Sequence, residues 1–317
     1  MAYTTIDDPS VYFQTALYAG DGSSSNAITN GGNSDLQPDW IWIKDRSATN
    51  GHGVQDTSRG IAKVLFTNGN DSEDQYTNTM VSSVQSDGFT VPNNSNSNTN
   101  TNNYVAWQWK ANGGTTTTND ASSTGVGSID SVYQANTTAG FSIVTYTGTG
   151  STATVAHGLG AVPDMLIFKK RSAQDNWYVY HKQLTNDYYL VLDTTDAKSN
   201  DVNIWNDTDP TSTVFSIANA GVHADGKTMV CYAFAEKKGY SRFGMYRGNG
   251  AADGTFVFTG FKPAWVMVKE YGANTNDWNI YDSKRSVFNS MDDILEANLT
   301  DAESTGRADI DFLSNGF

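Results

Sequence analysis

A short run of apolar residues that follows a proline and ends at a lysine occurs three times along the chain. Each run is rich in aromatic and β-branched side chains and is bounded by polar turn residues, which predicts a β-strand rather than a helix. Proline is tolerated at the first position of a strand, where its missing N–H breaks no ladder hydrogen bond. The strands are expected at residues 38–44, 163–169 and 263–269, and their defining residues are Pro38 and Trp40, Pro163 and Met165, and Pro263 and Trp265.

The surroundings of these strands recur as well. A Gly-x-Gly turn precedes each strand and ends at Gly22, Gly150 or Gly250. Glycine reaches the positive φ that a tight turn requires, so we interpret the motif as structural rather than as a phosphate-binding loop. A closing apolar strand follows in the first two copies, at residues 104–109 and 229–234. Self-similarity of this kind predicts an array of related domains.

The pattern predicts an all-β protein of three tandem antiparallel β-sandwich repeats of the jelly-roll type. Residues 1–110 are expected to form the first sandwich with a polar N-terminal lead-in, and residues 140–238 the second. Residues 111–139 are rich in Gly, Thr and Ser, and we interpret them as a linker with a short strand around residues 129–133. Residues 239–317 are expected to form the third sandwich, which lacks its closing strand.

The third repeat reaches Phe317, its counterpart of Phe89 and Phe215, and the sequence ends there. A sandwich that lacks a strand exposes an apolar strip and a row of unpaired N–H and C=O groups, which invites pairing with another chain. Two arrangements are acceptable: the natural protein continues, which we favour, or a neighbouring subunit donates the strand. The mass of the protein purified from its natural source distinguishes them.

Two segments lack a strand pattern. Residues 93–103 contain only Asn, Ser and Thr. They offer no apolar side chain to bury, so we predict an exposed loop that is dispensable for folding. Residues 291–297 are the clearest helix candidate.

The three strands at residues 38–44, 163–169 and 263–269, called the proline strands from here on, are apolar on both faces. A strand of a sandwich normally has one solvated face. A loop or helix of the same domain could cover the second face. Otherwise a neighbouring domain or another copy of the chain would have to cover it.

The chain has 317 residues and a formal net charge of −14. Neutralising phosphates requires clustered Lys and Arg, so this charge argues against nucleic acid and anionic membrane surfaces as partners. The sequence has neither a signal-peptide pattern nor a stretch of about 18 continuous apolar residues that could insert in a membrane. The single cysteine, Cys231, lies in an apolar strand and is expected to be a buried thiol. We therefore expect synthesis in a cytoplasm.

The sequence shows no motif of a known catalytic, cofactor or metal site, so we predict a protein that is not an enzyme and has no cofactor. The four histidines share no repeated position with acidic partners, which argues against a metal site. Acidic clusters at residues 71–74 and 206–209 could supply oxygen ligands to calcium. They lack the spacing of a calcium loop, and we interpret them as solvated turns.

Aromatic side chains are the remaining lead to a binding surface. Alternation places Trp177 and Val179 on one face of a strand and Tyr178 and Tyr180 on the other. The two tyrosines are expected to face outward, and together with Trp205 they are candidate contacts to a glycan or a protein partner.

Residues 140–150, with the following Ala156-His157-Gly158-Leu159-Gly160 and Pro163, resemble a repeat of tail-fibre-like virion proteins of marine tailed phages. Residues 239–244 and 260–265 resemble it too, and the likeness covers most of the chain from Tyr12 onward. Members of that family usually continue past the Asn-Gly-Phe motif into one more strand, and the family is largely catalogued as of unknown function.

This resemblance implies a structural virion protein, made in the host cytoplasm, that serves as a tail-fibre or adhesin component supporting host attachment. It implies other tail proteins as partners, a homo-oligomer with a trimer favoured, and a host surface glycan as a further candidate partner. The alternative is a polysaccharide-degrading depolymerase or a lectin-like glycan-binding module of the tail. An assay of reducing-sugar release from host polysaccharide separates an enzyme from a structural protein.

Overall fold

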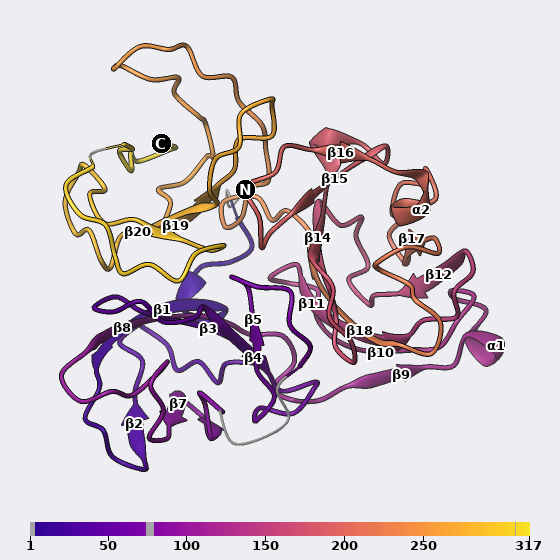
Figure 1. Cartoon of the computed structure of the whole chain (residues 1–317), viewed down its shortest axis with the longest axis horizontal. Helices are drawn as coiled ribbons and strands as arrows, with labels where there is room; N and C mark the ends of the chain where they lie inside the picture. The colour runs from indigo at the N-terminus through magenta and orange to yellow at the C-terminus, as the bar shows by residue number, and fades with distance from the viewer. Residues whose placement is uncertain (1–3, 74–78, 308) are drawn as a thin grey trace.

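The computed structural model describes residues 4–73, 79–307 and 309–317. Its regular structure is almost entirely β, and in the described part every pairing between named strands is antiparallel, which confirms the all-β prediction. Figure 1 shows three groups of strands around a common centre. We call them lobe 1 (residues 4–110), lobe 2 (residues 111–238) and lobe 3 (residues 239–317).

Lobe 1 contains a five-stranded sheet and a smaller three-stranded sheet. A short 3-10 helix, Pro9–Val11, precedes them. The large sheet has the order β1 (Phe13–Ala19), β8 (Asn103–Trp109), β3 (Trp40–Asp45), β4 (Gly53–Asp56) and β5 (Leu65–Phe66). The small sheet has the order β2 (Asn26–Ile28), β7 (Gly88–Val91) and β6 (Ser83–Gln85). Apolar side chains of both sheets, including Ile41 and Phe89, form one buried cluster between them.

Lobe 2 contains an eight-stranded sheet with the order β16 (Ser199–Asn200), β15 (Tyr188–Val191), β14 (Trp177–His181), β13 (Met165–Lys170), β18 (Thr228–Phe234), β11 (Phe141–Thr147), β10 (Ser131–Asn136) and β9 (Thr117–Asn119). The run β11-β18-β13-β14-β15 has the same order as β1-β8-β3-β4-β5 of lobe 1. A second sheet pairs β12 (Ala153–Ala156) with β17 (Val214–Ile217). The helical segments are α1 (Ala121–Thr124), Lys182–Leu184 and α2 (Val202–Trp205).

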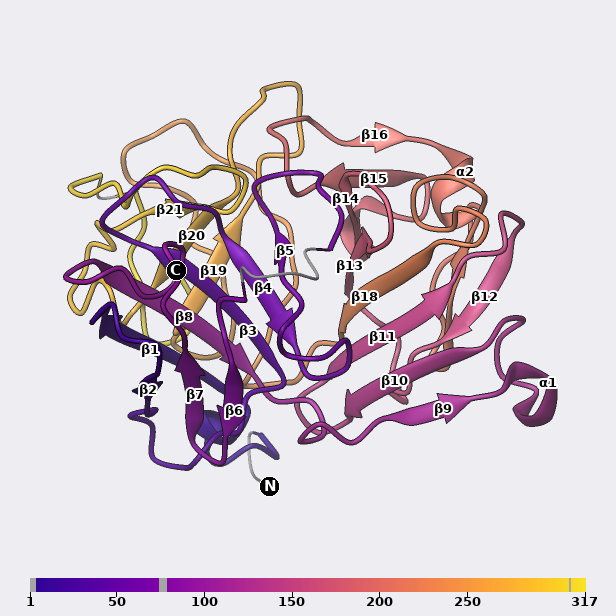
Figure 2. The same cartoon turned by 60° about the horizontal axis from the view of Figure 1, so that its bottom comes forward.

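Residues 111–139 do more than link two domains. They contain β9, α1 and β10, and both strands extend the large sheet of lobe 2 beyond β11 (Figure 2). The strand expected around residues 129–133 is present as β10, shifted toward the C-terminus. The Gly- and Thr-rich composition hid β9, which lies at the open edge of the sheet and contains only Thr and Asn.

Lobe 3 contains a three-stranded sheet of β19 (Trp265–Val268), β20 (Asn279–Asp282) and β21 (Leu295–Glu296). Its order matches β3-β4-β5 and β13-β14-β15. The helix predicted at residues 291–297 is wrong, because Leu295 pairs with Ile280 of β20 and both side chains are fully buried. Tertiary pairing outweighs the weak helix preference of this segment.

The proline strands pack on both faces because the lobes share a core. One face of β3, carrying Trp40 and Trp42, meets Met165 and Ile167 of β13 and Trp265 of β19 in a single apolar cluster at the centre of the molecule. The opposite face of each strand packs within its own lobe. A neighbouring domain, one of the alternatives left open by the sequence, therefore covers the second face.

The same contact recurs at all three boundaries between lobes. The lysine that ends each proline strand donates a hydrogen bond from Nζ to a loop carbonyl of the next lobe. The pairs are Lys44 to Thr300 at 2.9 Å, Lys169 to Asn70 at 2.9 Å, and Lys269 to Thr195 at 3.0 Å. Burial lowers the pKa of Lys44 and of Lys169 to about 8. The three contacts link the lobes into a closed ring.

Buried ion pairs reinforce two of these boundaries. Arg59 of lobe 1 contacts the carboxylates of Asp56 and Glu73, and Arg171 of lobe 2 contacts Glu73 at 3.0 Å. Arg285, Asp282 and Glu303 of lobe 3 form the equivalent group, which Arg46 of lobe 1 joins. At the third boundary the Nζ of Lys198 lies 5.8 Å from the ring centroid of Tyr271 instead.

This network corrects the interpretation of residues 71–74 as a solvated turn for Glu73, whereas Asp71 and Ser72 are exposed as expected. The Glu73 side chain is 2% exposed and pairs with three basic residues. Asp74 lies outside the described residues. The cluster at residues 206–209 is exposed as expected.

The Asn/Ser/Thr tract at residues 93–103 is the loop that its composition predicts, but it is only partly exposed. Ser97 and Asn98 are fully buried. The Asn98 side-chain oxygen accepts a hydrogen bond from the Asp21 N–H, and its Nδ2 donates to the Asp21 carboxylate and to the Ser23 carbonyl. Amide side chains bury favourably when their donors and acceptors are all satisfied. The tract thus holds the Gly20–Gly22 turn through hydrogen bonds rather than through apolar contacts.

Replacing Asn98 by alanine is expected to lower the free energy of unfolding by about 1–3 kcal/mol, because several buried partners lose their hydrogen bonds. Urea unfolding measures the effect. Asn100→Ala is the matched control, because Asn100 lies in the same tract with an exposed side chain. Equal losses for the two variants would mean that the amide contacts carry no stability.

Candidate functional site

The aromatic residues expected to face a glycan or partner are largely buried. Trp205 is 2% exposed and Tyr180 is 3% exposed, and their rings pack together with centroids 5.8 Å apart. The Trp205 indole donates to the carbonyl of Tyr188 at 3.0 Å, and the Tyr180 hydroxyl donates to Asp209 at 3.2 Å. Alternation assigned the tyrosines to the correct face of β14, but that face is covered by α2 and the small sheet of lobe 2.

Tyr178 is half-buried and is the member of this set that solvent reaches. Its hydroxyl donates to Asp175 at 3.2 Å, and its ring lies 5.6 Å from the ring of Tyr189. Gly221 approaches so closely that an added Cβ would lie 2.2 Å from the Tyr178 ring. Tyr178 is therefore held in place by packing, and the structure does not bring it together with Tyr180 and Trp205 in an open site.

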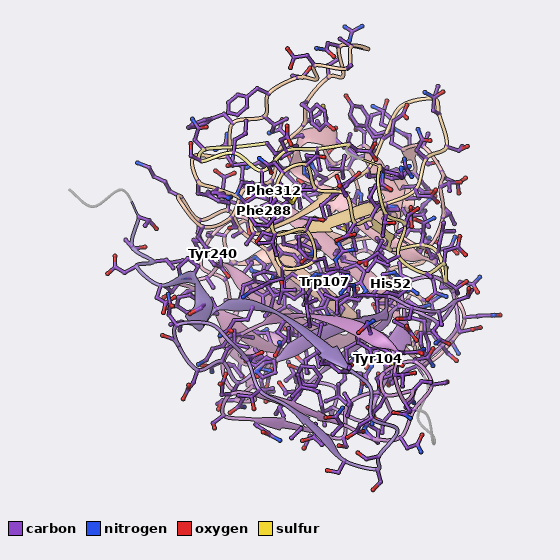
Figure 3. The ribbon with its side chains drawn as sticks, turned by 90° about the vertical axis from the view of Figure 1, so that its left-hand side faces the viewer. His52, Tyr104, Trp107, Tyr240, Phe288 and Phe312 are labelled. Carbon is purple, nitrogen blue, oxygen red and sulfur yellow. The ribbon has the colours of Figure 1, made fainter. Side chains whose placement is uncertain are left out.

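Of the four histidines, His52 belongs to lobe 1 and the other three belong to lobe 2. His52 is fully buried between Trp42 and Trp107, and its Nδ1 accepts a hydrogen bond from the Trp42 indole at 3.1 Å. Figure 3 labels His52 and Trp107 next to each other. Burial lowers the pKa of His52 well below its usual value. Among residues 4–73, 79–307 and 309–317, no group of His, Cys, Asp and Glu side chains has the geometry to hold a metal ion. Cys231 is a fully buried free thiol, as its apolar strand predicts.

The Gly-x-Gly turns have the backbone that the sequence predicts. Gly22, Gly150 and Gly250 have φ values of 68°, 67° and 70°. An L-residue with a side chain rarely adopts this conformation, so the motif is explained by turn geometry. In the described part of the chain, no helix has the length and apolar character of a membrane span.

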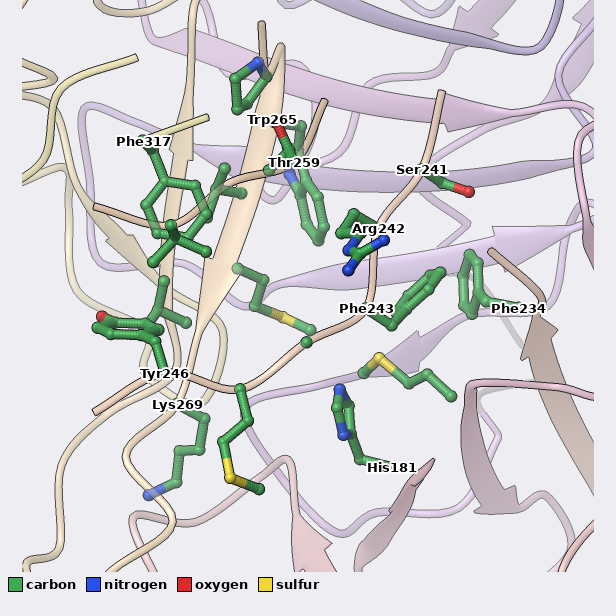
Figure 4. Close-up of a pocket in the computed structure, with 18 of the residues that line it drawn as sticks. His181, Phe234, Ser241, Arg242, Phe243, Tyr246, Thr259, Trp265, Lys269 and Phe317 are labelled. Atoms are coloured by element: carbon green, nitrogen blue, oxygen red, sulfur yellow. The ribbon is translucent and has the colours of Figure 1, made fainter. Parts of the chain in front are cut away.

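A hollow of about 1200 Å³ lies between lobe 3 and the centre of the molecule. Its wall is apolar and aromatic, and Figure 4 shows Phe243, Phe234 and His181 on one side with Trp265 of β19 on the other. Basic side chains line it as well, at Arg242, Arg247, Lys262 and Lys269. A mostly apolar and aromatic lining with a few polar groups is typical of a site that binds an apolar segment.

A family model for a domain of unknown function, DUF7483, matches residues 8–317. The chain belongs to the DUF7483 family. No curated protein and no solved structure matches the chain. The DUF7483 match covers all three lobes, which agrees with their shared core.

Sequence reasoning did not predict the hollow of the DUF7483 chain. The residues that line the hollow come from lobes 1 and 2 as well as from lobe 3. The usable signal was the recurrence of the motifs, because the third Gly-x-Gly turn and the third proline strand both contribute lining residues.

The stability of the DUF7483 chain is expected to fall as the pH drops from about 6.5 to about 4, in part through His157. His157 is fully buried; its Nδ1 accepts from the Leu159 N–H, so Nε2 donates to the Thr211 carbonyl at 3.1 Å. Burial lowers the pKa of His157 to about 4. Between about pH 6.5 and 4 this histidine is therefore protonated in the unfolded chain but not in the folded chain.

The contribution of His157 is present above the unfolded pKa of about 6.5 and is lost progressively toward the folded value, by up to about 3 kcal/mol. Urea unfolding of the protein and of His157→Gln across this pH range measures it. The variant keeps a donor toward Thr211 and cannot titrate, so its stability should fall less steeply. Parallel pH profiles would show that His157 does not contribute.

Proposed function

We propose that this chain is a structural virion protein of a tailed phage, a tail-fibre or adhesin component built from three repeats of one antiparallel β unit around an approximate threefold axis. The observation that carries the proposal is the closed ring of lobes, in which the same lysine contact recurs at each boundary and one apolar core is shared. Such a body is rigid at its centre and presents loops outside, which suits a mechanical and adhesive part.

Two further features support this proposal. The sequence resembles repeats of tail-fibre-like virion proteins, and the described residues bring together no catalytic constellation. The approximate threefold arrangement also suits a place on the axis of a trimeric fibre, with other tail proteins as neighbours. We therefore propose a non-enzymatic role in the virion, with a homotrimer as the favoured oligomer.

Antibodies raised against the purified chain test this role directly. Immunogold labelling of phage particles should mark the tail, and the purified chain should reduce adsorption of the phage to its host. Labelling of the capsid alone, or absence of the chain from particles that adsorb normally, would overturn the assignment.

A glycan-binding module of the tail is the second candidate. The observation in its favour is the aromatic lining of the hollow, because aromatic faces stack on sugar rings. A glycan array with the purified chain, and reducing-sugar release from host polysaccharide, separate a lectin-like module from a depolymerase and both from a structural protein.

A further inference from the structure

We propose that lobe 3 accepts a β-strand from outside residues 1–317, inserted between residues 241–246 and β19. This is the position that β8 occupies between β1 and β3, and that β18 occupies between β11 and β13. The inference rests on the repeat arrangement proposed above and is independent of the assignment to a virion.

The open edge of β19 is the first observation. β3 pairs with β4 and β8, and β13 pairs with β14 and β18, whereas β19 pairs only with β20 in the described part of the chain. All residues of β3 are buried, but Trp265, Met267 and Val268 of β19 are only partly buried. An apolar strand with one unpaired edge is a template for β-augmentation.

The third Gly-x-Gly turn also lacks a neighbour. An added Cβ at Gly22 would lie 3.2 Å from Asn100, and one at Gly150 would lie 3.0 Å from Asp225, in the loops that lead into β8 and β18. An added Cβ at Gly250 would meet no atom within 4 Å. The space beside this turn is therefore open where the other lobes hold the lead-in to the closing strand.

A tyrosine before each turn shows the same gap. The Tyr18 hydroxyl donates to the Ser97 carbonyl at 2.9 Å, and the Tyr146 hydroxyl donates to the Val222 carbonyl at 2.5 Å. Both acceptors lie in the lead-in to the closing strand. Tyr246 occupies the equivalent place in lobe 3; it is 42% exposed, and its hydroxyl has no hydrogen-bond partner among the described residues. The occupant is thus expected to supply a backbone carbonyl here.

His181 indicates one side chain of the occupant. At the other two boundaries an acid at this position receives a hydrogen bond from the closing strand of the next lobe: Asp56 from the Tyr232 hydroxyl at 2.8 Å, and Asp282 from the Trp107 indole at 3.0 Å. In lobe 2 the position is His181, whose Nδ1 accepts from the Gln183 N–H at 3.2 Å. Its Nε2 is then a donor, and because His181 lines the hollow, the occupant should carry an acceptor such as a tyrosine hydroxyl or a carboxylate.

The surroundings define the remaining chemistry. β18 places Val230 and Tyr232 in the central core and Met229 and Cys231 in the core of lobe 2, so both faces of a closing strand are apolar. The basic residues Arg242, Arg247 and Lys262 line the hollow. We therefore expect an extended segment with aromatic or aliphatic residues on both faces, one hydrogen-bond acceptor and no cationic side chain within the strand.

A second copy of residues 1–317 is an unsuitable donor. The two strands with this pattern, β8 and β18, lie inside their sheets with both edges paired. Releasing either one would open the sheet of its own lobe. The occupant must therefore be a polypeptide segment outside these residues.

A synthetic peptide tests the proposal. It carries residues 222–235 of lobe 2 with Cys231→Ser, so that Tyr232 supplies the acceptor for His181, and a fluorophore at its N-terminus. Fluorescence anisotropy with the full chain should show saturable binding at one site per chain. A peptide with N-methyl groups on alternate residues keeps the side chains but loses main-chain hydrogen bonds, and we expect its affinity to fall by at least about tenfold.

A second variant removes the dependence on peptide solubility. Residues 216–235, with the same Cys231→Ser change, are appended after Phe317, so that lobe 3 gains the segment that comes after Phe215 in lobe 2. The extended chain should melt at a higher temperature and should no longer bind the peptide. An appended scrambled sequence is the control and should change neither property.

Three outcomes would overturn the proposal. The first is no peptide binding together with an unchanged melting temperature of the extended chain. The second is equal binding of the N-methylated or scrambled peptide, which indicates non-specific adsorption to an apolar surface. The third is a dimer of the unextended chain in analytical ultracentrifugation that the peptide dissociates, because a second copy would then be the occupant. Failure of immunogold labelling affects none of these readouts.

Discussion

Replacing Arg59 by alanine is expected to lower the free energy of unfolding by about 3–5 kcal/mol. The Arg59 side chain is fully buried and contacts the carboxylates of Asp56 and Glu73, which are also buried. Without the guanidinium, two carboxylates remain inside the protein with fewer partners, and an unpaired buried charge costs more than the pair contributes. Urea unfolding at neutral pH measures the loss.

Arg242→Ala is the matched control for this prediction. Arg242 also pairs with a carboxylate, Glu236 at 2.8 Å, but its side chain is 48% exposed. Ion pairs at the surface contribute about 0–1 kcal/mol, so this variant should be nearly as stable as the unsubstituted chain. Arg285→Ala, in the equivalent group of lobe 3, should resemble Arg59→Ala. A loss below about 1 kcal/mol for both buried arginines would contradict the argument.

Replacing Trp40 by alanine is expected to lower the free energy of unfolding by about 3–5 kcal/mol and to shift one cooperative transition rather than part of it. Trp40 is 2% exposed, and its ring lies 4.5 Å from Trp109 of its own lobe and 4.6 Å from Tyr232 of lobe 2. The cavity left by the indole would open where the lobes meet. Calorimetry and urea unfolding followed by tryptophan fluorescence measure both aspects.

Trp265→Ala provides the comparison at the equivalent position of lobe 3. Trp265 is only partly buried beside the hollow, so less surface returns to water when its ring is removed. We expect a smaller loss than for Trp40→Ala. Separate transitions for individual lobes in either variant would contradict the view that the three lobes share one core.

The main strands of lobes 1 and 2 follow from local signals in the sequence. The proline strands, the Gly-x-Gly turns and the closing strands each have a length, an apolar pattern and bounding turn residues that act over a few positions. The positive φ of Gly22, Gly150 and Gly250 was predictable for the same reason. The all-β fold class rests on such local information.

The arrangement of the lobes and the state of the candidate residues depend on contacts that no local pattern contains. Alternation shows that Tyr180 lies opposite Val179, but it cannot show that Trp205 covers that face. The composition of residues 93–103 gave no sign that Asn98 is buried, because its burial depends on Asp21 and Ser23. Likewise, the sequence predicts an exposed Glu73, because it does not show that Arg171 of another lobe pairs with this carboxylate.

The hydrogen bond from Lys44 to Thr300 has a consequence for synthesis on the ribosome. Its two residues are separated by 256 positions in the sequence. Almost all of the chain must therefore be synthesised before this contact between lobes 1 and 3 can form. Until then Trp107 lacks its partner Asp282, and the apolar centre remains open to water. Long-range contacts of this kind slow folding and leave intermediates that are prone to aggregate. We therefore expect the nascent chain to bind chaperones.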